Sequence, residues 1–401
     1  MTRRVLVARL DSVGDVLLCG PAVRAVASSP GVDEVWLLCS SIGAPAGRML
    51  PGVAGVLEWD CPWITASAPP VSAAHLDRLD ELVRRIAPEA AVILTSFHQS
   101  PLPLALQLRL AGVPRIAGAS VDFAGTLLDV RLKPGEDFPE DQPEPLRALG
   151  IARAAGFTLP PEDDGALRVT GLGPLPAALG RFAGDVDGGL DGGLDGELES
   201  KSAGGSGGYV VVHPGASVPS RRWPEGHHAR VVELLRDAGV DVVVTGGPDE
   251  VELTRQVTGD DDAARRGDVV DLGGDTPLPV LAAVLAGASV VVSGNTGPAH
   301  IAAAVGTPVV SLFSPVVPAE RWAPYGVPHV LLGDQQAACR GTRATECPVP
   351  GHPCLTSVTP EQVVEACFAL APALQAPALQ APALEAAAPQ EAALQKEGAV
   401  R

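Results

Sequence analysis

The sequence predicts an α/β protein made of two doubly wound domains, each with a parallel sheet. At 401 residues, 46% of them hydrophobic, the chain exceeds one compact core and suits two domains of ~150 residues each. Short apolar runs alternate with longer helical patterns, which is typical of parallel sheets. Residues 184–208 interrupt this alternation with a Gly-, Asp- and Ser-rich composition that cannot bury a core.

We expect the first domain over residues 1–165 and a linker with the flexible insertion over residues 166–208. The first-domain strands are predicted at 4–10, 34–39, 90–94 and 115–117, and its helices include 16–27, 73–86 and 102–110. A turn at 11–15 should precede the first helix. Pro21 should then kink or restart that helix, because proline interrupts helical hydrogen bonding.

The second domain is expected over residues 209–370, followed by a low-complexity tail over 371–401 that repeats Ala-Pro-Ala-Leu-Gln. Its strands are predicted at 209–212, 241–245, 269–272, 289–292 and 308–313, and its helices at 226–238, 249–258, 278–286 and 298–305. Thr359 and Gln362 form a capping box with Pro360 at the first helical position, which predicts a last helix over 360–370.

The segment Ser-Gly-Asn-Thr-Gly-Pro-Ala-His at 293–300 joins a buried strand to a helix. Free N–H groups and the positive end of the helix dipole at such a start favour a bound anion, for example a phosphate. Thr296 adds a hydroxyl, Gly297 lets a ligand approach the backbone, and His300 faces the same opening. An ordinary strand–helix junction with a surface histidine explains the same residues equally well.

A second polar turn follows the first predicted strand. Gly14 permits a tight turn at the carboxyl end of that strand, where open α/β sheets bind ligands. Asp15 then lies at a helix start facing the crevice, either as a functional carboxylate or as a simple helix-start residue. Asp11 is the better candidate for a turn or cap residue.

Three motifs in order resemble glycosyltransferase family 9, the ADP-heptose:LPS heptosyltransferase family. They are Gly-Asp-Val-Leu at 14–17, His-Pro-Gly-Ala at 213–216 with Arg-Arg-Trp-Pro at 221–224, and the segment from Thr296 to Pro308. The resemblance covers about residues 3–370. Two positions depart from the family pattern: Asn295 replaces the usual Asp, and Arg221 the usual Lys.

The resemblance implies a GT-B architecture, in which two Rossmann-like domains face a central cleft and a late helix, here 360–370, crosses back to the first domain. It implies an inverting, metal-independent transfer of heptose or a related sugar from a nucleotide-diphosphate donor, with an ADP-sugar expected. The acceptor would be a hydroxyl of a glycan or glycolipid in the biosynthesis of lipopolysaccharide or another cell-surface glycan. No cofactor is expected.

Sugar transfer needs a base for the acceptor hydroxyl and a group of donors that holds the departing diphosphate. Position and resemblance make Asp15 the candidate base. Arg can bind phosphate through two nitrogens, so Arg221 can keep the role of the usual Lys. The residues expected to bind the diphosphate are Arg221, Thr296, Gly297 and His300.

Two further residues are assigned to the donor's sugars. Glu250 follows a strand end and can accept hydrogen bonds from ribose hydroxyls, or it is simply a first-turn helix residue. Asn295 can hydrogen-bond a sugar hydroxyl but cannot act as a carboxylate, which leaves a donor sugar other than heptose as an alternative. No metal ligands are assigned, because Asp185-Val-Asp187 and the acidic run 260–262 lie in loops.

Other functions are weighed against transfer. A sugar-nucleotide epimerase of the same architecture would bind the same donor, and a non-catalytic sugar-nucleotide-binding protein is favoured by Asn295 alone. A nicotinamide dehydrogenase is disfavoured, because no Gly-x-Gly-x-x-Gly opens a helix after the first strand. The net charge of −18 argues against nucleic acid as a partner.

The apolar run after Met-Thr-Arg-Arg stops at Asp11, too early for a secretory signal, and no apolar segment reaches the ~20 residues of a membrane span. We therefore expect a cytoplasmic protein, and leave open a peripheral contact with the inner face of the membrane.

Of the seven cysteines, three in apolar runs are expected to be buried: Cys19, Cys39 and Cys367. Cys61 lies in a loop and is left unassigned. Cys339, Cys347 and Cys354, with His352, could in principle hold zinc. Their spacing lacks a paired Cys-x-x-Cys, so an ordered or redox-labile loop is the preferred interpretation.

Overall fold

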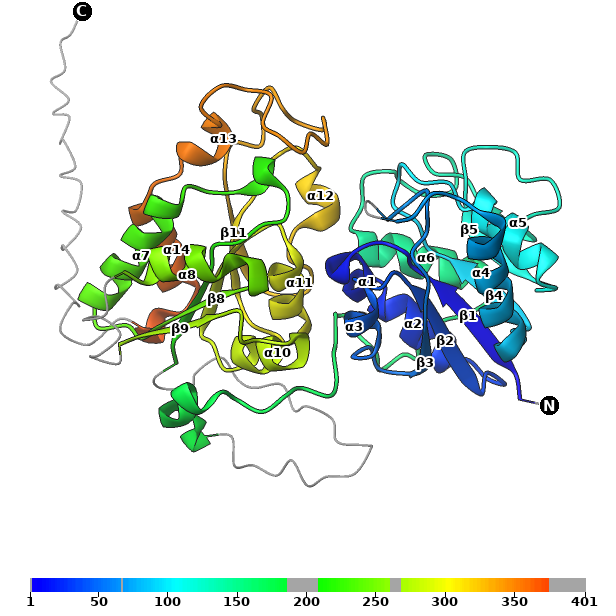
Figure 1. The fold of residues 1–401 in the computed structure, drawn as a ribbon, viewed down its shortest axis with the longest axis horizontal. Coiled ribbons are helices and arrows are strands. Elements are labelled where there is room, and N and C mark those ends of the chain that lie inside the picture. Colours follow the sequence, from blue (N-terminus) through cyan, green and yellow to red (C-terminus); the bar gives the residue numbers. More distant parts are fainter. Residues whose placement is uncertain (1, 66–67, 186–207, 260–267, 375–401) are drawn as a thin grey trace, which may run out of the picture.

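The computed structural model describes residues 2–65, 68–185, 208–259 and 268–374. In it two α/β domains lie side by side (Figure 1). All ladders of the two six-stranded sheets are parallel. The predicted fold class, two Rossmann-like doubly wound domains, is therefore confirmed.

The first sheet has the strand order β3-β2-β1-β4-β5-β6. Its strands are β1 (Arg4–Ala8), β2 (Glu34–Cys39), β3 (Val53–Glu58), β4 (Ala90–Ile93), β5 (Ile116–Ala119) and β6 (Val130–Leu132). Its helices are α1 (Val13–Leu18), α2 (Gly20–Ala27), α3 (Ala44–Gly47), α4 (Ala73–Ile86), α5 (Leu102–Leu110) and α6 (Glu144–Ala154), and the short helix η1 (Ala177–Asp185) follows them.

The second sheet has the order β12-β11-β10-β7-β8-β9. Its strands are β7 (Val210–His213), β8 (Val242–Gly246), β9 (Val269–Gly273), β10 (Val290–Gly294), β11 (Val309–Leu312) and β12 (His329–Leu332). The helices are η2 (Pro219–Arg221), α7 (Glu225–Asp237), η3 (Pro248–Glu250), α8 (Val251–Thr258), α10 (Leu278–Ala286), α11 (Gly297–Ala304), α12 (Ala319–Trp322), α13 (Pro353–Thr356), α14 (Pro360–Leu370) and η4 (Pro372–Leu374).

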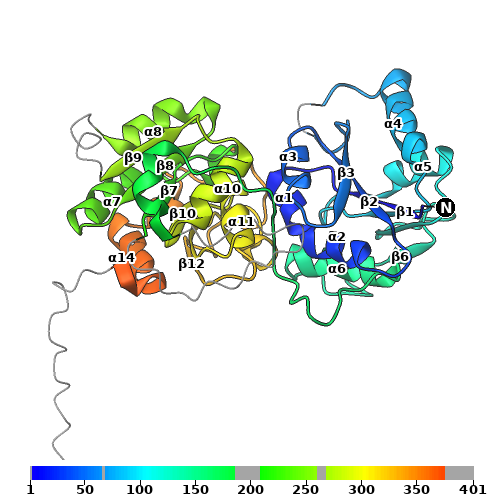
Figure 2. The ribbon, with the colours of Figure 1, turned by 90° about the horizontal axis from the view of Figure 1, so that it is seen from below.

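Both faces of the first sheet are covered, as its apolar strands require. Successive residues of β1 point to opposite faces. Val5 and Val7 pack with α1, α2 and α6, whereas Leu6 and Ala8 pack with α4 and α5. The first of these apolar clusters continues into α10 and α11 of the second domain, so the two domains share buried surface where α1 meets α11. Figure 2 shows the same adjacency from below.

Each sheet reverses its strand order next to its first strand, β1 or β7. Such switch points leave a crevice at the carboxyl ends of the strands, where doubly wound proteins bind ligands. Here the crevice after β1 and the crevice beside β10 open toward each other, because α1 and α11 start at those strand ends and pack together.

Most predicted elements are present, several with the expected bounds: β2, α4, α5, α10 and α14. The capping box of Thr359 and Gln362 is also present. The start of the first helix was predicted wrongly: α1 begins at Val13, inside the expected turn, and its restart comes at Gly20 with Pro21 in the first turn. Three strands, β3, β6 and β12, the helix α6 and the four-residue helices α3, α12 and α13 were not predicted.

The expectation that helix 360–370 crosses to the first domain is wrong. The buried side chains of α14 are Val363, Ala366 and Cys367, and they join the second-domain core beside α7, β10, β11 and β12. The predicted domain boundaries stay predictions. Most of the insertion 184–208 and of the tail 371–401, Asp187 and the acidic run 260–262 lie outside the described residues.

In the described part of the chain, no helix combines the length and the apolar character that crossing a membrane requires.

The capping box yields a stability prediction. Thr359→Ala removes the hydroxyl that accepts from Gln362 N, 3.3 Å away, and should lower the unfolding free energy by ~1 kcal/mol. Because α14 lies away from the cleft between the domains, ligand binding there should not change. Thermal melting, with exposed Ser357→Ala as the matched control, measures this. Equal melting temperatures for the two variants would contradict it.

Candidate active-site cleft

One cavity of about 530 Å³ lies between the carboxyl ends of the two sheets. Its walls come from both domains, with the start of α1 on one side and the start of α11 on the other. All seven residues predicted from the sequence line it, namely Asp15, Arg221, Glu250, Asn295, Thr296, Gly297 and His300. The fold thus gathers into one place residues that are up to 285 positions apart, the separation of Asp15 and His300 (300 − 15).

Asp15 lies in the first turn of α1, where the helix dipole favours a carboxylate. Oδ1 accepts from Nη2 of Arg9 at 2.8 Å and from Nε1 of Trp322 at 3.4 Å, and Oδ2 accepts from the Ser12 hydroxyl at 2.8 Å. Burial alone would raise the pKa of this carboxyl, but Arg9 and these hydrogen bonds outweigh it and hold the pKa below its usual value. Asp15 is therefore ionised at neutral pH.

Arg9 is the buried cation that organises this side of the cleft. Its side chain is 2% exposed and also pairs through Nε with Asp11 Oδ2 at 2.7 Å and through Nη1 with Glu144 Oε2 at 3.4 Å. Nη2 donates to Ser96 as well. Burial and the adjacent charge of Asp15 raise the pKa of Asp11 to about 6, although Arg9 opposes this. Of the two aspartates after β1, Asp15 is the one that stays charged most firmly.

On the opposite wall, α11 opens with Gly297 after Thr296, and the Thr296 hydroxyl lies 3.2 Å from that of Ser293. The first N–H groups of a helix have no partner within the helix. This arrangement agrees with the anion-binding turn predicted from the sequence.

At Gly297 the backbone does not require glycine. Gly297 is not among the glycines with positive φ, and a β-carbon there would lie 3.6 Å from Val13 Cγ1, an ordinary contact. The steric need for glycine lies across the interface, at Gly14. A β-carbon at Gly14 would lie 2.7 Å from Cδ2 of His300, which is closer than real side chains approach.

His300 is 5% exposed, and burial lowers its pKa to about 4, with Asp15 opposing and Arg221 reinforcing the shift. The imidazole is thus neutral at pH 7. Within the described residues its Nδ1 has no hydrogen-bond partner. A neutral ring with an unpartnered nitrogen can donate one hydrogen bond to a ligand, or accept one.

Arg221 ends η2 and reaches the cavity beside β10. Its Nη1 donates to the backbone carbonyl of Asn295 at 3.3 Å, and its buried Nε has no partner among the described residues. Burial lowers the pKa of Arg221, but a guanidinium remains charged in proteins. A half-buried, partly unpaired guanidinium is suited to bind an anion.

The Asn295 side chain is buried, with 4% exposure, and neither its Oδ1 nor its Nδ2 has a partner in the described part of the structure. A buried amide without hydrogen bonds costs ~1–3 kcal/mol. Since Asn295 lines the cavity, a ligand hydroxyl could satisfy both atoms by accepting from Nδ2 and donating to Oδ1.

Glu250 has the helix-start role that the sequence left open, and it also lines the cavity; its ribose-binding role stays a prediction. Its Oε2 accepts from Gly247 N at 2.7 Å, as a helix-start residue would, and lies 3.8 Å from Nε2 of His213. The other ring nitrogen of His213 lies 3.0 Å from the Thr245 hydroxyl. A β-carbon at Gly215 would lie 2.1 Å from Glu250 Oε1, so glycine there leaves room for the carboxylate.

Several cavity residues were not predicted. Phe97, His98, Trp322 and Arg343 belong to loops or a short helix without a recognised motif. Arg9, which holds Asp15 from behind the cavity wall, was also not predicted, because it is hidden in an apolar strand run. One signal for Arg9 was present in the sequence: a charged residue lies inside a strand that is otherwise apolar. A buried Arg needs partners of opposite charge, so acidic residues near it were to be expected.

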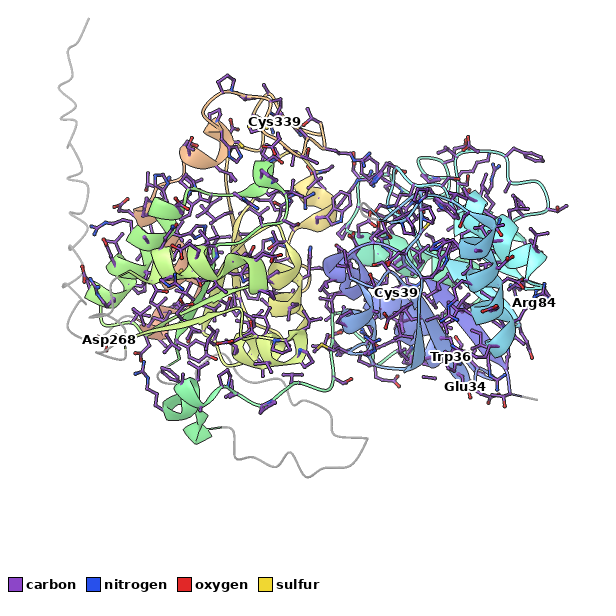
Figure 3. The ribbon with its side chains drawn as sticks, in the orientation of Figure 1. Glu34, Trp36, Cys39, Arg84, Asp268 and Cys339 are labelled. Atoms are coloured by element: carbon purple, nitrogen blue, oxygen red, sulfur yellow. The ribbon has the colours of Figure 1, made fainter. Side chains whose placement is uncertain are left out.

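The cysteines lie away from this cavity. Cys19, Cys39 and Cys367 are buried as predicted, and Cys61 is buried too. Figure 3 shows Cys339 in the loop of the second domain and Cys39 in the first. His352 Nε2 lies 3.0 Å from the Ser220 carbonyl, and among the described residues no group of three potential metal ligands comes together.

Comparison with known proteins agrees with the motifs. Residues 194–351 match the model of glycosyltransferase family 9 (heptosyltransferase). Lipopolysaccharide heptosyltransferase 3 of Escherichia coli is 35% identical over 111 residues, which are 28% of this chain and 32% of that protein. The chain thus matches about a third of the length of this relative.

Solved structures extend the similarity to both domains. A family 9 glycosyl transferase from Veillonella parvula superposes with a TM-score of 0.68 at 16% identity, over 92% of this chain and 97% of that one. The E. coli heptosyltransferase WaaC with ADP superposes with a TM-score of 0.62 at 19% sequence identity, over 92% of this chain and 100% of that one. The predicted resemblance is confirmed, by sequence in the second domain and by GT-B fold over both.

The contact between Gly14 and His300 is testable. Gly14→Ala should displace the buried imidazole or separate α1 from α11, at a cost of ~1–3 kcal/mol in unfolding free energy. Gly297→Ala, on the facing helix, meets only an ordinary contact and should change stability much less. Denaturant unfolding of both variants measures the difference. Equal losses would show that the close approach at Gly14 is not required.

Proposed function

We propose that this protein, which resembles the family 9 heptosyltransferases, is a glycosyltransferase that moves a sugar from a nucleotide-diphosphate donor to a hydroxyl of a glycan or glycolipid. One observation carries the proposal. The ionised carboxylate of Asp15 and the anion-binding groups of the second domain line one cavity from opposite sides. Base and leaving-group site thus stand on either side of a bound sugar.

In the proposed reaction, the acceptor oxygen attacks the anomeric carbon of the donor sugar. The bond from that carbon to the diphosphate oxygen breaks, and its electron pair leaves with the nucleoside diphosphate. Asp15 takes the proton of the acceptor hydroxyl as general base. Attack from the side opposite the leaving group in a single displacement inverts the anomeric centre.

The diphosphate is proposed to lie on the first turn of α11, where Thr296, Gly297 and the dipole favour negative charge. Arg221 provides a full positive charge, and neutral His300 a hydrogen bond. Charge stabilisation by fixed donors in a water-poor site is a large contribution to such reactions. Because these groups neutralise the leaving diphosphate, the transfer needs no divalent metal.

Glu250 is proposed to bind ribose hydroxyls of the donor, and Asn295 a hydroxyl of the transferred sugar. An ADP-sugar is the proposed donor, supported by the similarity to a heptosyltransferase structure with ADP. Heptose or a related sugar is proposed, in the synthesis of lipopolysaccharide or another cell-surface glycan, since the similar curated protein is a lipopolysaccharide heptosyltransferase.

The acceptor is proposed to enter on the first-domain side. A second hollow adjoins the main cavity there and shares His98 and Arg343 with it. Its wall also includes Trp63, Gln99 and Ser100, polar and aromatic groups suited to a sugar, beside the apolar Ile64 and Pro103. An acceptor hydroxyl placed in this hollow would approach Asp15 from the side opposite α11.

Asp15→Asn tests the proposed base. It keeps the shape but removes proton acceptance, so turnover of ADP-sugars with a glycan acceptor should fall ~10²–10⁴-fold, with donor affinity little changed. Products are followed by mass spectrometry in EDTA, with exposed Asp122→Asn as the control. Near-normal turnover of Asp15→Asn would remove it as the base. Formation of epimerised donor without transfer would favour the epimerase. If the wild type converts no donor at all, the non-catalytic binding protein would be favoured.

Asn295→Ala tests the sugar contact. The variant should bind ADP like the wild type but lose the extra affinity of an ADP-sugar over ADP, by about two- to tenfold for one or two hydrogen bonds. Calorimetry with both ligands gives the ratio, and the ADP affinity serves as the internal control. An unchanged ratio would mean that Asn295 does not bind the sugar.

A further inference from the structure

The short helix α12 belongs to the second domain by sequence and connection, yet two of its side chains contact the first. Arg321 and Trp322 point across the interface, and Figure 1 shows α12 on the side of its domain that faces the first domain. The neighbouring Glu320 is exposed and pairs with Arg340, at 3.7 Å, within its own domain. The helix therefore has one face that crosses the interface and one that does not.

Arg321 enters an acidic recess of the first domain. Its Nη2 lies 3.3 Å from Glu140 Oε1 and 3.3 Å from Asp141 Oδ1, and its Nη1 lies 3.9 Å from Glu144 Oε1. The guanidinium carbon is 4.2 Å from the centroid of the Phe97 ring. With the Arg321 side chain 2% exposed, separating the domains would leave this pairing unmade and expose the recess to water.

Glu144 links this recess to the candidate base. Its two oxygens face two different cations, Oε1 toward Arg321 and Oε2 toward Arg9, which in turn holds Asp15. Trp322 makes the direct contact, because its indole N–H donates to Asp15 Oδ1 at 3.4 Å. The helix thus reaches Asp15 by two routes, one through Trp322 and one through Arg321, Glu144 and Arg9.

We propose that α12 is an interdomain latch in which Arg321 and Trp322 are positioning residues for Asp15. With α12 docked, Oδ1 of Asp15 is fixed between Arg9 and Trp322, and the lone pairs that remain face the cavity. With α12 undocked, Asp15 loses one donor and Glu144 loses one of its two cations. Full base activity is thereby confined to the state in which both halves of the cleft are together.

The catalytic part of this inference rests on the proposed sugar transfer, whereas the docking part does not. Trp322→Phe removes the indole donor and keeps a smaller aromatic ring on the side of Phe97, whose ring centroid lies 5.8 Å from that of the indole. Arg321→Met keeps much of the side-chain length but removes the charge. Glu320→Gln, on the same helix, is the matched control.

We expect kcat to fall at least tenfold in Arg321→Met and at least threefold in Trp322→Phe, with the KM for an ADP-sugar unchanged within twofold. Glu320→Gln should behave like the wild type. A purely structural loss would instead lower the melting temperature, or would raise KM while kcat falls. Arg321→Lys keeps a positive charge and should recover part of the lost kcat.

Hydrogen–deuterium exchange gives a second measurement that needs no turnover. Backbone amides of α1, including Val16 N, which donates to Ser12 O at 3.0 Å, should exchange faster in Arg321→Met than in the wild type or Glu320→Gln. If the wild type transfers sugar and both variants keep its kcat, the proposal is overturned. If the wild type transfers none, the proposed function fails, and unchanged exchange in Arg321→Met would then overturn the latch itself.

Discussion

The cleft depends on one buried positive charge, the guanidinium of Arg9 at the end of β1. Three carboxylates surround it, those of Asp11, Asp15 and Glu144. Burial nevertheless raises the pKa of both Asp11 and Glu144, against the attraction of Arg9 and, for Glu144, also of Arg147 and Arg321. The Asp15 pKa moves the other way because Asp15 also receives hydrogen bonds from Ser12 and Trp322. Of the three carboxylates around Arg9, Asp15 is therefore the one whose pKa lies below its usual value.

The second constraint is the contact that brings the two strand ends together. Gly14 lets the His300 ring approach the backbone of α1, and Val13 lies against Gly297. Both helices begin at the cavity, so the positive ends of two dipoles face the same volume. On the first-domain side Asp15 lies within that field, whereas on the second-domain side no described carboxylate occupies the start of α11. The same helix-start geometry therefore holds a carboxylate in one domain, whereas in the other it leaves the helix start open to the anion that we propose there.

Local sequence patterns predicted what local physics controls. Buried valine-rich strands, the amphipathic α4 and the capped α14 were recognisable because their periodicity or caps lie within a few residues. The strand β6 was not, because it is three residues long and half buried, and β12 begins at an exposed histidine. The partner of α14 was predicted wrongly, since its burying face, Val363 and Cys367, fits either domain equally well by sequence.

The candidate site divides in the same way. Asp15, Arg221 and the turn at 293–300 were predicted because glycines and polar residues that follow an apolar strand can be recognised in the sequence alone. Arg9 and Trp322 were not found, since their importance comes from contacts with residues far along the chain, 135 positions away for Glu144 and 307 for Asp15. Such long-range pairing has no periodic signature, and only the three-dimensional structure brings these groups together.

The two departures from the family pattern lie next to each other in space, and they bear on the same charge balance. Arg221 donates to the backbone carbonyl of Asn295. The side chain at position 295 is an uncharged amide, where the family usually has a carboxylate. An aspartate at 295 would have neutralised part of the positive charge, whereas asparagine leaves it available to a ligand. The wall around α11 is consequently more positive, and the wall around Asp15 carries the negative charge. A donor with an anionic diphosphate would be oriented by this separation, with its leaving group toward α11 and its sugar toward Asp15.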